Sequence, residues 1–68
     1  MLVIPFAAQE LGNRFRFDVP NPDDYEVDQS YDAEAEDPDG SYPVTATIVA
    51  KHGRQIAGTF EDESPPGA

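Results

Sequence analysis

The sequence predicts an all-β fold of five short antiparallel strands in meander order, forming a small curled sheet or a partly open barrel. Apolar and polar residues alternate with a period of two through most of the chain, as in strands that bury one face. Gly, Pro, Asn and Asp separate the alternating stretches, and such residues are typical of turns. No stretch predicts a long amphipathic helix, so the strands must build the core alone.

The first predicted strand is Leu2 to Ala7, a short apolar run. Pro5 lacks a backbone N–H, which favours an edge strand or a bulge. A single helical turn over 8–11 and a chain reversal at 12–13 are expected next, because Gly12 and Asn13 tolerate positive φ.

The second predicted strand is Arg14 to Val19. Its alternation places Phe15, Phe17 and Val19 inward, and Arg14 and Arg16 side by side on the outward face. These arginines are expected to neutralise neighbouring carboxylates there; docking an acidic or phosphate-bearing partner is the alternative. The connection 20–24 contains two prolines and should be neither helix nor paired strand.

The third predicted strand, Tyr25 to Glu36, has one acidic face. Successive side chains of a strand point to opposite sides, and residues two apart lie roughly 6.5 to 7 Å from each other. This stretch therefore places a row of carboxylates above an apolar row: Glu26, Asp28, Asp32, Glu34 and Glu36.

A turn over 37–40 should connect this strand to the fourth, 42–51, because Asp-Pro-Asp-Gly is typical of a type I turn. With that loop, Glu36 pairs with Ser41, and both apolar rows fall on one face. A slip by one residue would place apolar residues opposite acidic ones, so the pattern selects this register. The same register places Glu26 opposite Lys51.

The last hairpin should turn at 52–54 and return through Gln55 to Phe60. Keeping its apolar residues on the core face requires Ala50 opposite Ile56, and hence an odd-numbered loop with a bulge. Residues 61–68 have the composition of a flexible acidic tail, so residues 1–60 are expected to form a single domain.

Composition limits the function. A chain of 68 residues without cysteine has a thin core and neither disulfides nor thiolate metal sites. Fourteen acidic and four basic residues give a net charge of −10, which repels nucleic acid and anionic membranes and attracts basic surfaces. An acid-rich, lysine-poor surface is also typical of proteins from cells with concentrated internal salt, and this remains an alternative explanation.

No pattern of catalytic residues is found. His52, the only histidine, lies in a predicted turn without a specified partner. Aligning Gly40 with the invariant glycine of a calcium loop places Ala35 and Ala46 where carboxylate ligands are required. Paired carboxylates on a thin sheet also lack the concave pocket that glycoside hydrolysis needs. We therefore expect no enzyme activity, no cofactor and no specific metal.

The sequence thus predicts a small interaction protein whose carboxylate row docks on a basic, nucleic-acid-binding type of protein surface. A virus- or mobile-element-encoded inhibitor that mimics nucleic acid is the sharpest form of this hypothesis. The alternative is a structural subunit of a virus particle or another large assembly. If the sheet stays open, a second copy or another protein would cover its apolar face. The segment 1–8 lacks the basic flank of a signal peptide, so a cytoplasmic or virion location is expected.

Overall fold

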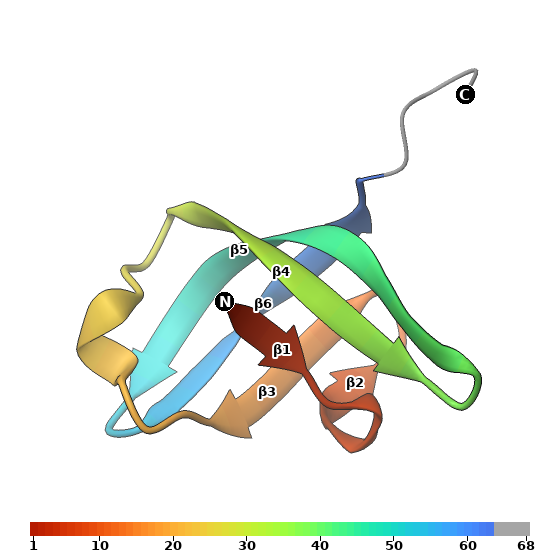
Figure 1. Cartoon of the computed structure of the whole chain (residues 1–68). Helices are drawn as coiled ribbons and strands as arrows, with labels where there is room; N and C mark the ends of the chain where they lie inside the picture. The colour runs from red at the N-terminus through yellow and green to blue at the C-terminus, as the bar shows by residue number, and fades with distance from the viewer. Residues whose placement is uncertain (64–68) are drawn as a thin grey trace.

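The computed structural model describes residues 1–63 and shows a curled sheet of six strands that forms a half-barrel (Figure 1). The all-β class and the curled sheet are confirmed. In chain order the elements are β1 (Leu2–Ile4), the 3-10 turn η1 (Phe6–Ala8), β2 (Gln9–Glu10), β3 (Arg14–Asp18), the 3-10 turn η2 (Pro22–Asp24), β4 (Ser30–Asp37), β5 (Gly40–His52) and β6 (Gln55–Asp62).

The predicted meander of five antiparallel strands is wrong in strand number, order and direction. The order across the sheet is β1-β4-β5-β6-β3-β2, and β1 runs parallel to β4. Pro5 ends β1, and the turn η1 leads the chain away before β2 begins, so β1 does not form a hairpin with the next strand. β3 instead pairs with β6, which is distant in the sequence.

The β4–β5 hairpin has the predicted register, with Glu36 opposite Ser41 and Ala33 opposite Val44. The loop is shorter than predicted, because Asp37 and Gly40 also pair and only Pro38 and Asp39 remain between the strands. A carboxylate oxygen of Asp37 accepts the N–H of Asp39 at 2.9 Å, which stabilises the tight turn.

The predicted start of the acidic strand at Tyr25 is wrong, because β4 begins only at Ser30. Asp28 has a φ of +72°, which does not fit an extended strand, and its N–H donates to the carbonyl of Ile48 at 2.8 Å. The expected pair of Glu26 and Lys51 does not form either. The ammonium of Lys51 donates to the carbonyls of Pro22 at 3.0 Å and Tyr25 at 2.7 Å, which holds the connection between β3 and β4 against β5.

The bulge predicted in the last hairpin lies in the strand instead of the loop. Only Gly53 and Arg54 separate β5 from β6, and the register shifts between Ile48 and Ala50. Ala50 therefore lies opposite Ala57, and the predicted pairing with Ile56 is wrong. The extra residue in β5, Val49, is exposed, and so is Ala50 beyond it. Before the bulge, Ile48 and Ala46 lie opposite Gly58 and Phe60 and share the core face with them.

The strand β6 continues beyond Phe60, so Glu61 and Asp62 belong to the sheet and not to a tail. The N–H of Glu63 donates to the carbonyl of Pro43 at 3.1 Å. The remainder of the predicted tail, 64–68, lies outside the described residues.

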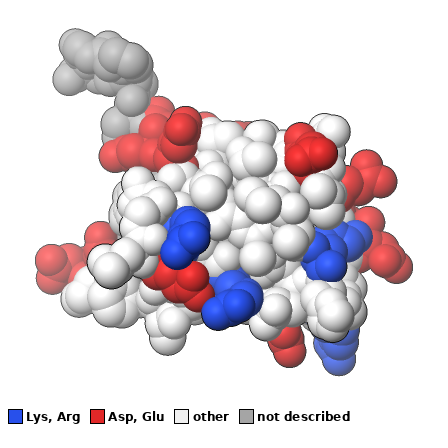
Figure 2. Space-filling model, turned by 180° about the vertical axis from the view of Figure 1, so that it is seen from behind, with Lys and Arg blue, Asp and Glu red and all other residues white. Residues whose placement is uncertain are grey.

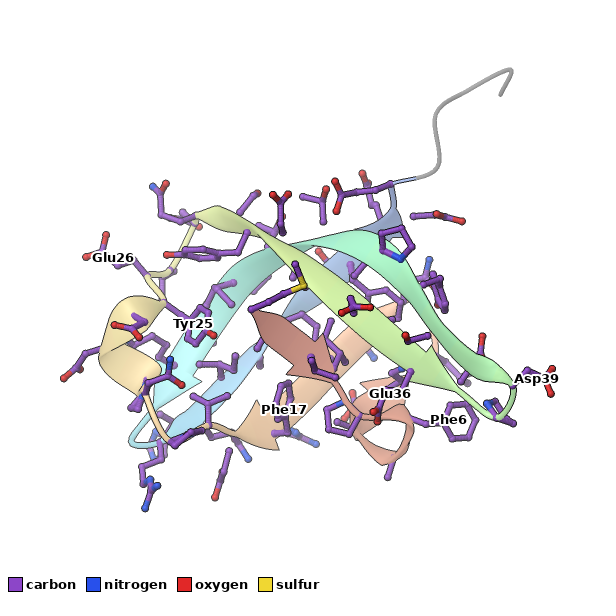
Figure 3. The ribbon with its side chains drawn as sticks, in the orientation of Figure 1. Phe6, Phe17, Tyr25, Glu26, Glu36 and Asp39 are labelled. Carbon is purple, nitrogen blue, oxygen red and sulfur yellow. The ribbon has the colours of Figure 1, made fainter. Side chains whose placement is uncertain are left out.

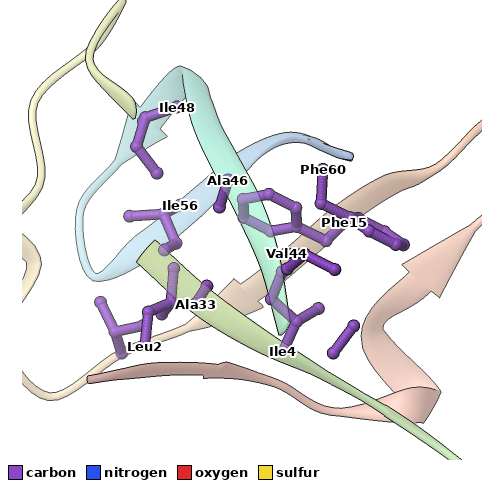
Figure 4. Close-up of a cluster of buried hydrophobic side chains, with 11 residues drawn as sticks. Leu2, Ile4, Phe15, Ala33, Val44, Ala46, Ile48, Ile56 and Phe60 are labelled. Atoms are coloured by element: carbon purple, nitrogen blue, oxygen red, sulfur yellow. The ribbon is translucent and has the colours of Figure 1, made fainter. Parts of the chain in front are cut away.

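One apolar cluster fills the concave side of the sheet (Figure 4). Phe15 is buried at its centre, with ring centroids 6.0 Å from Phe17 and 6.4 Å from Phe60. Phe15 lies opposite Gly58 in the β3–β6 register, so its ring covers a position without a side chain. The buried members come from β1, β3, β4, β5 and β6 and, for Val19, from the residue after β3: Leu2, Ile4, Phe15, Val19, Ala33, Ala35, Val44, Ala46, Ile48, Ile56 and Phe60.

Candidate functional site

The outward face of β4 is acidic. Ala33 and Ala35 are 2% and 0% exposed and face the core, so the residues that alternate with them point outward. These are Asp32, Glu34 and Glu36, which the sequence places on one face. Their backbone positions are spaced roughly 6.5 to 7 Å apart along the strand.

Glu61 of β6 belongs to the same face. Thr45 of β5 lies opposite Asp32 on one side and opposite Glu61 on the other. Neighbouring strands are about 4.8 Å apart, so Glu61 and Asp32 lie roughly two strand spacings from each other. We call Asp32, Glu34, Glu36 and Glu61 the acidic surface.

Glu61 was missed because the acidic composition of 61–63 predicts a tail. A signal was present nevertheless. Ile56, Gly58 and Phe60 alternate inward, and extending that alternation places Glu61 outward beside Thr59.

Glu26 and Asp28 do not extend the row. They lie in the irregular segment before β4, where the N–H of Glu26 donates to the hydroxyl of Tyr31 at 2.8 Å. The Tyr25 ring meets the Tyr31 ring edge to face at 5.3 Å, which fixes this segment against the start of β4. Figure 3 shows Glu26 at the opposite end of the molecule from Glu36 and Asp39.

The acidic surface is not neutralised within residues 1–63. Glu34 accepts a hydrogen bond from the hydroxyl of Ser41 at 3.3 Å. The one ion pair recorded among these residues lies elsewhere, between Arg16 and Glu10 at 3.3 Å. Among the described residues, therefore, no ion pair involves the acidic surface on β4 and the end of β6.

The basic residues lie on β3 and around the β5–β6 hairpin: Arg14, Arg16, Lys51 and Arg54. Figure 2 shows the molecule from behind the view of Figure 1. On this side the Lys and Arg side chains (blue) occupy the middle and lower part, while most Asp and Glu side chains (red) lie around the rim. The expected neutralising role is observed for Arg16, through Glu10. Arg14 and Arg16, with Val49, line a shallow hollow of about 230 Å³.

His52 and the carboxylates are the side chains that a catalytic or metal-binding arrangement would use. His52 is exposed at the end of β5, where its backbone pairs with Gln55. Within residues 1–63, no cluster of three or more His, Asp or Glu side chains has a geometry suited to a metal ion. Nor does this part of the chain contain a helix long and apolar enough to cross a membrane.

The chain was compared with models of protein families, with curated proteins and with solved structures. No match was found in any of these three comparisons. The interpretation of the acidic surface therefore rests on its own geometry and charge.

Proposed function

We propose that this chain is a non-enzymatic interaction protein that binds a basic protein surface through its acidic surface. The observation that carries the proposal is the outward alignment of Asp32, Glu34 and Glu36 on β4, with Glu61 two strands away. The partner would be of the type that otherwise holds nucleic acid.

Rigidity supports this proposal. β4 is hydrogen-bonded on both sides, to β5 along its whole length and to β1 at 33–35. The carboxylates therefore project from a fixed frame, and a partner orders little backbone when it binds. Pre-organisation of this kind raises affinity by lowering the entropic cost of association.

The absence of ion pairs on the acidic surface among residues 1–63 also supports it. The carboxylates of the acidic surface carry like charges two residues or two strands apart, so they repel one another. A basic partner would relieve that repulsion by placing cations beside the carboxylates. The carboxylates would in turn displace the anions bound to the partner's basic surface, as nucleic acid does. The mechanism is occupancy of the partner's surface, with no covalent step.

Competition with DNA tests the proposal. An arginine-rich peptide is first bound to a labelled DNA duplex, and the chain is then added at a series of salt concentrations. We expect the chain to displace the duplex at low salt. Its own affinity for the peptide should fall roughly tenfold or more between ~50 and ~200 mM salt, because screening weakens exposed charge pairs.

An affinity for the peptide that is insensitive to salt would contradict the proposal. Such a result would favour association through apolar burial, as expected for a subunit of an assembly.

A further inference from the structure

We infer that Phe6 is the apolar anchor of this docking surface and inserts into an apolar hollow of the basic partner. The inference rests on the proposed function and adds a requirement to it. A basic surface alone would not be the full ligand; it must also offer a pocket for an aromatic ring beside its cationic groups.

Phe6 lies at the end of the acidic surface. β1 runs parallel to β4 with Ile4 opposite Ala35, so the chain that follows β1 passes the Glu36 end of β4. The turn η1, which contains Phe6, packs against β4. In Figure 3 the ring of Phe6 lies between Glu36 and Asp39, at the end where the β4–β5 hairpin turns.

Hydrogen bonds hold this turn in place. The N–H of Ala8 donates to the carbonyl of Pro5 at 3.0 Å, and the N–H of Gln9 donates to the carbonyl of Phe6. The side-chain amide of Gln9 donates to the carbonyl of Glu36 at 2.6 Å, which ties the segment directly to β4. The ring is thus presented from a fixed backbone, as binding hot spots commonly are.

The exposure of Phe6 is unusual for its residue type. Its side chain is 57% exposed, and it is the only exposed aromatic residue among those described. An aromatic side chain buries a large area when it inserts into a pocket of a partner, and aromatic residues are enriched at the centres of interfaces. Val3, 41% exposed and opposite Glu34, widens the apolar part of this end.

Two other strongly exposed apolar residues, Val49 and Leu11, have different surroundings. Val49 is 58% exposed but lies beside Arg14 and Arg16. Leu11 is 92% exposed in the turn between β2 and β3. Because Phe6 lies at the Glu36 end of the acidic surface, two copies meeting at this end would bring like charges together. Charge complementarity therefore favours a cationic partner over a second copy.

Two arginine-rich peptides of equal length and charge test the inference, one with interleaved leucines and the other with serines. We expect Phe6→Ala to weaken binding of the leucine peptide about tenfold, through loss of a buried aromatic contact. Binding of the serine peptide should change less than about twofold. Phe6→Leu should retain most of the affinity for the leucine peptide, and Val49→Ala, which alters an equally exposed residue, should change neither affinity.

Three results would overturn the inference. Equal effects of Phe6→Ala on both peptides, or no effect on either, would show that the ring makes no specific apolar contact. A wild-type dimer that Phe6→Ala converts to a monomer in sedimentation would assign the ring to self-association. If neither peptide binds the wild-type chain at low salt, the proposed function fails as well, which distinguishes the two failures.

Discussion

Gly58→Ala is expected to destabilise the fold by about 3 kcal/mol or more, the upper part of the range for overpacking a core. A Cβ at this position would lie 1.9 Å from the carbonyl oxygen of Thr47 and 3.0 Å from the ring of Phe15. The oxygen belongs to the backbone of β5, so the clash can be relieved only by moving the strand. The midpoint of urea denaturation, followed by circular dichroism, measures the effect.

Gly12→Ala is the matched control. Gly12 has a φ of +82°, and a Cβ there would have no neighbour within 4 Å. This substitution should cost about 1 kcal/mol, from backbone strain alone. Equal effects of the two substitutions would contradict the close approach of β5 and β6 at Gly58.

Reversing two charges of the acidic surface, in Asp32→Lys/Glu34→Lys, is expected to weaken binding of an arginine-rich peptide by roughly a hundredfold. Attraction is replaced by repulsion at the centre of the surface, and each reversed charge acts over a short distance. The loss should shrink as salt is raised, because both attraction and repulsion are screened. Titration calorimetry at several salt concentrations measures it.

The control is Asp18→Lys/Asp23→Lys, which makes the same change in net charge away from the acidic surface. Asp18 lies on β3 and Asp23 in η2, and both are exposed. This variant should lose at most about tenfold, from the change in overall field. If the two double variants lose affinity equally, binding depends on net charge and the acidic surface has no special role.

The parts of the fold that the sequence predicted are those that depend on local pattern. Alternation and turn residues determine the β4–β5 register, because a slip of one residue would bury carboxylates. The same reasoning indicated a bulge near the last hairpin, but placed it in the loop, whereas the register shifts within β5 at Val49.

The strand order could not be predicted in this way. Pairing of β1 with β4 and of β3 with β6 joins segments far apart in the sequence, and alternation says which face a residue occupies but not which strand is its neighbour. Likewise, Asp28 keeps the parity of a strand residue, yet its positive φ and its bond to Ile48 place it in a turn.

The candidate site was predicted only in part. Asp32, Glu34 and Glu36 share a face because the buried alanines between them fix their direction. Glu26 and Asp28 fall outside that face because β4 starts later. Glu61 joins it because β6 extends further than composition suggests.

The most direct test of the central claim is to map the binding surface by NMR, with an arginine-rich peptide added to the isotope-labelled chain. The largest shift changes are expected at the backbone amides of Asp32, Glu34, Glu36 and Glu61. Changes spread evenly over the molecule, or concentrated around Glu26 and Asp28, would contradict the assignment of this surface as the docking site.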